Sequence, residues 1–260
     1  MTATAFMMPP HVTLESQGNH NQILPRDVCQ KAAKYAIRVS QEISSYSKLE
    51  GNSDGIPLLE REEVHVGDML GSGGFNHVFE VTSIELLEGG GRHVKLTSTP
   101  TQELARKLVA KRGRNPEALA VKFLNEHAMS NSEDYCNGAA DLLLEARYLA
   151  LLASYPHPNL IRLHGIAAAG ANGFSEGVEA GYFLILDRLY DSLDQRLEVW
   201  KELERRKVEG LVKNPDYSHH LKALFLKRLM ISLDLCSAIE HLHKLKIVFR
   251  DLKPDNVGEF

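Results

Sequence analysis

The sequence predicts an α+β protein, because strand signals and helix signals are segregated along the chain. Short apolar runs rich in β-branched and aromatic residues recur between residues 64 and 124 and again at 182–186. Two long stretches with helical periodicity follow, at about 192–208 and 220–244. The 260 residues, 43% of them hydrophobic, can form one sizeable domain or two small ones around a common cleft. We therefore expect an antiparallel sheet with one helix, followed by a helical part.

The N-terminal 60 residues carry few structural signals. Residues 1–25 are polar, contain adjacent prolines and are expected to form a flexible tail. A loose helical spacing predicts a short helix from about Asp27 to Ser44. The acidic run Glu60–Glu63 is expected to be a solvated entry into the domain.

Strands are then expected on both sides of a glycine-rich turn at residues 71–74, with Val64–Val66 before it and Val78–Val81 after it. Residues 87–117 are glycine-rich and basic and predict an inserted loop with about one helical turn. The apolar run Ala118–Leu124 predicts a short strand.

A helix is expected from about Ala139 to Ala153, followed by strands at 160–166 and 182–186. The apolar stripe of this helix is formed by Leu142, Leu149 and Leu152, and Glu145 falls within that stripe. An isolated buried carboxylate is too costly to leave unpaired. Glu145 therefore predicts a cationic partner facing this helix.

Composition excludes several classes of protein. The formal net charge of −4 gives no electrostatic argument for a nucleic-acid or membrane-surface partner. The three cysteines (Cys29, Cys136 and Cys236) are far apart and odd in number, as expected for reduced thiols in a cytoplasmic or nuclear protein. No apolar run is long enough to span a membrane, and the start has no secretory signal pattern. The sequence does not fix the oligomeric state.

The segment Leu70–Val78 carries the first chemical signal. Glycines at 71 and 73 let backbone N–H groups approach a phosphate closely, because no Cβ intervenes. A plain glycine-rich hairpin turn explains such a pattern in roughly half of cases. A strand, not a helix, follows the glycines, which is typical of a flap over phosphates and not of a dinucleotide-binding turn.

Lys122 interrupts an otherwise apolar strand. One interpretation is an edge-strand lysine whose amine reaches water. The other is a buried ammonium that pairs with Glu145 and holds phosphate oxygens.

The segment Phe249–Val257 carries the strongest signal. It brings an aspartate, a lysine and an asparagine into one tight loop, at Asp251, Lys253 and Asn256. Phosphoryl transfer needs an acceptor for the hydroxyl proton, a cation for the moving phosphoryl and an oxygen ligand for Mg²⁺. A charged turn that carries these residues by chance is the alternative.

The chain resembles the eukaryotic protein kinase family, because it carries motifs typical of that family in the same order. These are the glycine turn, the Lys122 strand, Glu145, the His157-Pro158-Asn159 turn and the Asp251 loop. The resemblance implies a two-lobed fold, with a complete small lobe and hinge at about 61–189 and the first part of a helical large lobe at 190–260. Lys253 followed by proline is the serine/threonine version of the loop, and the chain leans towards the tyrosine-kinase-like group. The implied activity is transfer of the γ-phosphoryl of ATP, with Mg²⁺, to hydroxyls of a protein substrate.

The resemblance also assigns roles to residues. Lys122 with Glu145 would hold phosphates, Asp251 would be the catalytic base, Lys253 the γ-phosphate cation and Asn256 the Mg²⁺ ligand. The remaining nucleotide contacts would come from the glycine turn, its neighbouring strands and the hinge, with Leu186 as gatekeeper: Leu70, Gly71, Ser72, Gly73, Gly74, Val78, Ala120, Leu186, Asp187 and Leu189.

Three departures from the family pattern stand out. Asn76 replaces the third glycine, where we expect its tolerance of left-handed backbone to preserve the loop. Phe249 replaces the usual histidine before Arg250. The Asp-Phe-Gly motif and activation segment do not occur before Phe260, so we expect residues 1–260 alone to be a poor catalyst. The rival hypothesis is a non-catalytic kinase-like fragment that binds a nucleotide or a partner and regulates it.

Overall fold

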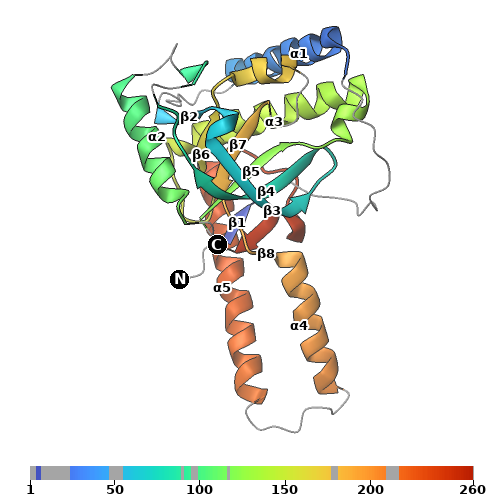
Figure 1. The fold of residues 1–260 in the computed structure, drawn as a ribbon. Coiled ribbons are helices and arrows are strands. Elements are labelled where there is room, and N and C mark those ends of the chain that lie inside the picture. Colours follow the sequence, from blue (N-terminus) through green and yellow to red (C-terminus); the bar gives the residue numbers. More distant parts are fainter. Residues whose placement is uncertain are drawn as a thin grey trace. The chain divides into compact units, whose positions relative to one another are not determined.

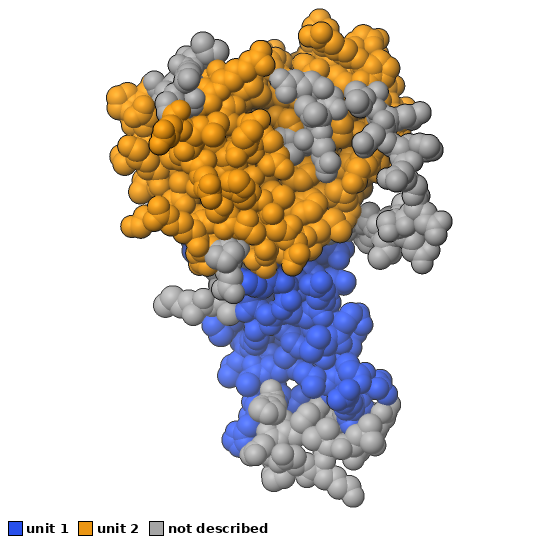
Figure 2. Space-filling view, in the orientation of Figure 1, with its two compact units in different colours: residues 1–9, 157–161, 189–260 blue, residues 10–156, 162–188 orange. Residues whose placement is uncertain are grey.

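The computed structural model describes residues 4–6, 24–46, 55–88, 91–94, 99–115, 118–176, 181–208 and 217–259. The chain divides into two compact units, coloured separately in Figure 2. We call residues 10–156 with 162–188 the sheet unit, and residues 1–9, 157–161 and 189–260 the helical unit. The predicted α+β class is confirmed, and the architecture is compatible with a kinase-like fold.

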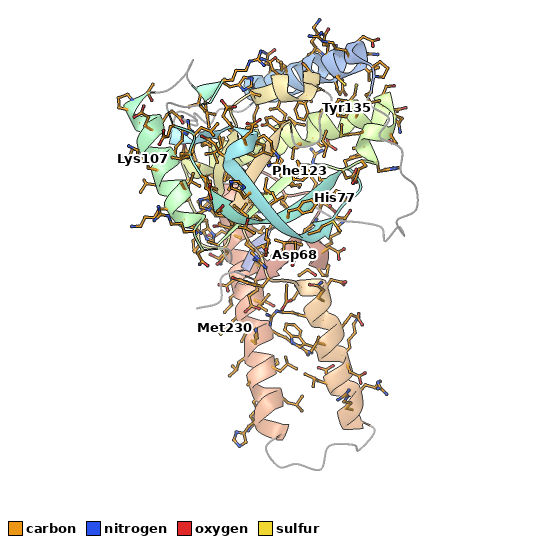
Figure 3. The ribbon with its side chains drawn as sticks, in the orientation of Figure 1. Asp68, His77, Lys107, Phe123, Tyr135 and Met230 are labelled. Atoms are coloured by element: carbon orange, nitrogen blue, oxygen red, sulfur yellow. The ribbon has the colours of Figure 1, made fainter. Side chains whose placement is uncertain are left out.

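The sheet unit contains a mixed six-stranded sheet in the order β2-β6-β7-β5-β4-β3. Its strands are β2 (Leu58–Leu59), β3 (Val64–Ser72), β4 (Asn76–Ile84), β5 (Leu119–Leu124), β6 (Leu163–Ala167) and β7 (Phe183–Asp187). β2 runs parallel to β6, and the other pairs are antiparallel. His77 and Phe123, labelled in Figure 3, are register partners on β4 and β5. The predicted strands are thus present, and the glycine-rich turn joins β3 to β4.

Two helices pack together in the sheet unit, α1 (Arg26–Tyr46) and α3 (Ser132–Ala153) (Figure 1). The buried face of α1 includes the small side chains of Cys29, Ala32, Ala33, Ala36 and Ser40, which allow close approach of the two helices. α3 begins earlier than the predicted Ala139. Its N-cap is Asn131, whose side chain accepts hydrogen bonds from the first-turn amides of Glu133 and Asp134. Most of the expected tail 1–25 lies outside the described residues.

The insertion at 87–117 is more ordered than predicted. It contains the 13-residue helix α2 (Pro100–Arg112), not a single helical turn. The Thr99 side chain caps its first turn by accepting from the Gln102 amide, Pro100 is its first residue and Gly113 ends it. These end signals predict a helix, but only three of its residues are buried, so the apolar periodicity is weak.

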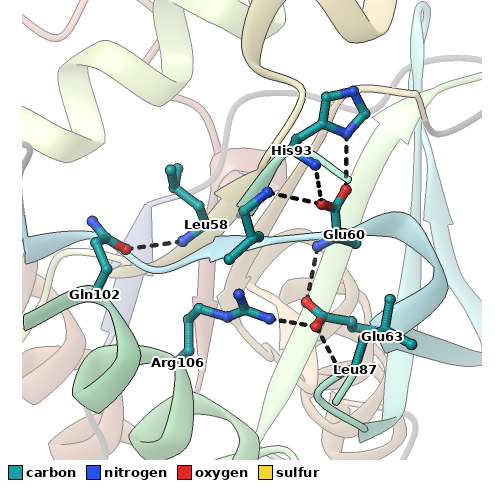
Figure 4. A network of polar contacts seen from close by, with 8 residues as sticks. Leu58, Glu60, Glu63, Leu87, His93, Gln102 and Arg106 are labelled. Atoms are coloured by element: carbon teal, nitrogen blue, oxygen red, sulfur yellow. Dashed lines mark hydrogen bonds and ion pairs between the residues drawn. The ribbon is translucent and has the colours of Figure 1, made fainter. Parts of the chain in front are cut away.

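Two members of the acidic run before β3, Glu60 and Glu63, are buried, whereas Glu62 is exposed. The prediction of a solvated entry is therefore wrong for Glu60 and Glu63. The Glu63 carboxylate accepts hydrogen bonds from the amides of Glu60 (2.9 Å) and Leu87 (2.8 Å) and pairs with Arg106 of α2 (Figure 4). The Glu60 carboxylate accepts from the amide and ring of His93 at 2.6 and 2.9 Å. Burial would raise the pKa of Glu60, but the hydrogen bonds from His93 and the Val94 amide outweigh it and lower that pKa. This network attaches the insertion to the start of β3.

The helical unit contains the antiparallel sheet β1-β9-β8 and two long helices. The elements are β1 (Thr4–Phe6), β8 (Asp191–Ser192), α4 (Leu193–Val208), α5 (Tyr217–Lys244) and β9 (Val257–Glu259). Both predicted helices are confirmed, and the break expected at Asn214–Asp216 lies outside the described residues. α4 and α5 contact each other through the buried Trp200, over which the Arg228 guanidinium lies 4.9 Å from the ring centroid. Within the described ranges, no helix has the length and apolar character needed to cross a bilayer.

Candidate active site

Lys122 and Glu145 form a buried ion pair in the sheet unit. β5 lies between β4 and β7, so Lys122 is on an interior strand and its amine does not reach water at a sheet edge. Nζ of Lys122 lies 2.7 Å from Oε2 of Glu145, and the two side chains are only 6% and 11% exposed. The expected partner of Glu145 is therefore Lys122, as the burial argument predicted. A buried ion pair of this kind holds an ammonium in a fixed position.

The glycine-rich turn lies at the end of the β3–β4 hairpin. Gly73 N donates to Asn76 O at 2.7 Å, which closes the turn. A Cβ added at Gly71 or Gly74 would meet no atom of the described residues within 4 Å, so the part of the chain that the structure describes leaves open space beside the turn. That space suits close approach of a ligand to the peptide groups.

Asn76 does not use the left-handed backbone that asparagine tolerates. Asn76 starts β4 and pairs with Leu124, and among the described non-glycine residues only Lys246 has a positive φ. The sharp chain reversal falls on residues 73–75, so no glycine is needed at position 76. The other side chains expected near the nucleotide differ in exposure: Leu70 is exposed, Ser72 is half-buried, and Val78, Ala120 and Leu186 are buried.

Asp187, expected at the hinge, has a buried carboxylate whose two arginine partners are partly exposed. Its carboxylate accepts from His164 Nε2 at 2.7 Å, from Arg112 at 2.8 Å and from Arg162 Nε at 3.1 Å. Burial would raise the pKa of Asp187, but hydrogen bonds and charge from His164 and Arg162 outweigh it, so the pKa lies below its usual value. Leu189, the other expected hinge residue, belongs to the helical unit, where a Cβ added at Gly258 would lie 2.6 Å from its Cδ1.

The Asp187 cluster predicts acid-sensitive stability. The pKa of Asp187 is lower in the folded protein than in the unfolded chain, where an aspartate has a pKa of about 3.9. The ionised carboxylate therefore stabilises the fold at pH values above about 3.9. This stabilisation is lost as the pH falls through the pKa of the folded state. We expect Asp187→Asn to be less stable than wild type near neutral pH, with the difference shrinking below about pH 4. Urea unfolding from about pH 3 to 7 measures this. Glu202→Gln, which alters an exposed carboxylate, should leave the difference from wild type small at every pH. A constant gap between Asp187→Asn and wild type would contradict the assignment.

In the helical unit, Asp251, Lys253 and Asn256 converge as predicted. Nδ2 of Asn256 donates to the backbone oxygen of Asp251 at 2.7 Å and to its Oδ2 at 3.0 Å. Nζ of Lys253 lies 3.4 Å from the same Oδ2. Asn256 is fully buried, in the short helical turn Pro254–Asn256, whereas the Asp251 side chain is 50% exposed. A buried amide thus holds an accessible carboxylate next to an ammonium.

Asn256 also fits a role as a metal ligand. Its Oδ1 is buried and has no hydrogen-bond partner among the residues that the structure describes, whereas its Nδ2 faces Asp251. An amide oxygen is a hard ligand of the kind that Mg²⁺ accepts. The described residues contain no group of three His, Cys, Asp or Glu side chains placed to hold a metal ion, so Asn256 accounts for one ligand and not for a complete set.

Sequence reasoning missed several residues that support these groups. Arg112 of α2 contacts Asp187 across 75 residues of sequence, and no local signal predicts that contact. Asn125, which follows β5, holds the glycine turn through two hydrogen bonds. The sequence does contain a signal for Asn125, because a polar residue at the end of a buried strand needs hydrogen-bond partners.

The α+β fold and its candidate site residues are those of a kinase-like protein. These residues form a glycine hairpin, a lysine–glutamate pair and an aspartate–asparagine loop. Comparison with known proteins agrees at that level. The chain is similar to the serine/threonine-protein kinase/endoribonuclease IRE1a of Arabidopsis thaliana, with 31% identity over 130 residues. The similarity covers 41% of this chain and 14% of the relative's length. No protein-family profile matches the chain.

Proposed function

We propose that this chain is the nucleotide-binding and catalytic-loop part of a serine/threonine protein kinase that acts on protein substrates in the cytoplasm or nucleus. The proposal assigns residues 61–189 to the small lobe and hinge and residues 190–260 to the first part of the large lobe. The observation that carries it is the Asp251–Lys253–Asn256 arrangement, which combines in one turn a proton acceptor, a cation and an amide oxygen that has no partner among the described residues. The similarity to part of a serine/threonine-protein kinase supports the same assignment.

In this reaction, the oxygen of a serine or threonine hydroxyl forms a bond to the γ-phosphorus of ATP. The bond from that phosphorus to the bridging oxygen breaks, ADP leaves, and the hydroxyl proton passes to the Asp251 carboxylate. Asp251 is suited to this role because its carboxylate is half-exposed and oriented by Asn256. Lys253 lies beside it and would neutralise charge on the moving phosphoryl.

The second set of residues would bind the nucleotide. Lys122, fixed by Glu145, would contact phosphate oxygens, and the turn at Gly71–Gly74 would cover them with backbone N–H groups. Ala120 and Leu186 would line the adenine pocket, and the backbone of Asp187 and Leu189 would bind its edge. Mg²⁺, held in part by Oδ1 of Asn256, would supply neutralisation of the phosphate charge.

Phosphotransfer by the full-length gene product tests the proposal. We expect transfer of label from γ-labelled ATP to serine or threonine in a protein acceptor, and we expect Lys122→Met to reduce kcat/KM by about 10²- to 10³-fold, because a charge that stabilises the phosphates is lost. Lys107→Met, which alters an exposed lysine of α2, is the matched control and should change the rate little. Phosphoamino-acid analysis identifies the product.

Two results would contradict the proposal. A gene product that binds ATP and transfers no phosphate would favour the rival hypothesis of a non-catalytic regulator. Activity undiminished in Lys122→Met would remove the assignment of Lys122.

A further inference from the structure

The Asn125 side chain forms hydrogen bonds with the backbone of the glycine-rich turn. Its amide nitrogen donates to Gly73 O at 2.9 Å and to Gly74 O at 3.3 Å, and its Oδ1 accepts from the Ala128 amide at 2.7 Å. The residue is only 4% exposed. A buried amide with partners for both hydrogens and for its oxygen has a single stable orientation. The two glycine carbonyls are therefore directed at one fixed donor.

Neighbouring contacts strengthen this attachment. Asn125 N donates to Phe75 O at 2.9 Å, and Nε2 of His77 lies 2.8 Å from a carboxylate oxygen of Glu126. Asn125 comes directly after β5, three residues beyond Lys122. The turn is thus connected to the strand that carries the buried lysine.

The other side of the turn contacts α3. A Cβ added at Gly138 would lie 3.2 Å from Cβ of Phe75, so Phe75 lies directly against the helix backbone. Gly138 and Glu145 are seven residues apart, about two helical turns, and therefore lie on one face of α3. The turn is fixed relative to both members of the Lys122–Glu145 pair.

The orientation of the two carbonyls has a consequence for the amides. In a trans peptide unit, the C=O and the following N–H point in opposite directions. Because the carbonyls of Gly73 and Gly74 face Asn125, the N–H groups of Gly74 and Phe75 face the other way. Two successive N–H groups on one side of a turn form a site that favours an anion. At Gly74 an added Cβ would meet none of the described atoms within 4 Å, so the described ranges leave space there.

We propose that Asn125 is a positioning residue for phosphate binding: it fixes the peptide groups of Gly73 and Gly74 so that the amides of Gly74 and Phe75 are presented to the phosphates of the nucleotide. The inference rests on the proposed function and deepens it. In this role Asn125 does not contact the nucleotide but acts through the glycine turn. It predicts that the turn is prearranged before the nucleotide binds.

The test compares ATP with adenosine, which lacks phosphates, by calorimetric titration of the full-length gene product. Asn125→Ala removes both donors, and we expect its affinity for ATP to fall about tenfold, the effect of losing roughly two ordinary hydrogen bonds. Affinity for adenosine should stay within about twofold of wild type. Asn125→Asp keeps the acceptor for the Ala128 amide but cannot donate to the glycines, and it should lose ATP affinity as well. Asn131→Asp adds the same charge at an exposed cap position and should bind both ligands normally.

The outcomes separate this inference from the function on which it rests. If wild type binds ATP and Asn125→Ala binds it equally well, or loses ATP and adenosine affinity in parallel, the positioning role is wrong and the kinase proposal stands. Wild-type ATP affinity in Asn125→Asp would assign the effect to the Ala128 contact and would also overturn the role. If wild type binds neither ligand, both proposals fail. Amide hydrogen exchange at residues 73–76 without nucleotide should be faster in Asn125→Ala, and unchanged exchange would contradict the prearranged turn.

Discussion

Replacement of Asp251 by asparagine is expected to lower kcat for phosphotransfer by about 10²- to 10⁴-fold, the range that a general base contributes. The substitution keeps the size of the side chain and keeps an oxygen that can accept from Asn256, which now donates to Oδ2 at 3.0 Å. The loop geometry should therefore persist, and KM for ATP should change little. Steady-state kinetics of the full-length gene product measure both parameters.

Asp255→Asn is the matched control for Asp251→Asn. It makes the same chemical change four residues later in the same loop, at a position to which the proposal assigns no chemistry. Its kcat should stay within a few-fold of wild type. Equal losses in the two variants would point to a general disturbance of the loop and would contradict the role of Asp251 as the base.

The largest effect on stability is expected from Arg106→Gln. Glu63 is fully buried, and Arg106 is the cationic partner that compensates its charge. Removing one partner of a buried ion pair typically costs about 3–5 kcal/mol, because the remaining charge is left uncompensated in a site away from water. We expect the free energy of unfolding, measured by urea denaturation, to fall by about that amount.

A double-mutant cycle refines this prediction. Glu63→Gln combined with Arg106→Gln should cost less than the sum of the single substitutions, because neither charge is then left alone. Lys107→Gln, at an exposed position next to Arg106 on α2, should change stability by no more than about 0.5 kcal/mol. If Arg106→Gln unfolds at the same urea concentration as Lys107→Gln, α2 is not attached to the start of β3 in solution.

Much of the fold was predictable because the signals are local. β5 is a run of six residues that is apolar except at Lys122. The two long helices of the helical unit have clear periodicity and are confirmed. The length of α2 was underestimated as about one turn because most of its residues face solvent, although Thr99, Pro100 and Gly113 mark its ends. The start of α3 was placed too late for a similar reason, since its first turn is polar and is defined by the Asn131 cap.

The Lys122–Glu145 pair could be inferred from the sequence alone. Each of the two charged side chains lies in an otherwise apolar pattern, and a buried charge needs a partner of opposite sign. The trio Asp251, Lys253 and Asn256 is likewise local, since one turn of chain brings the three together. The sequence by itself determined these two sets.

Only the tertiary structure decided which other charged and polar residues are buried. Glu63 lies in an acidic run that has every sequence feature of an exposed segment, yet Arg106, 43 residues away, covers it. Asp187 and Asn125 gain their roles from Arg112 and from the glycine turn in the same way. The burial of a polar group depends on which distant segments pack against it, and that information is not contained in its neighbours along the chain.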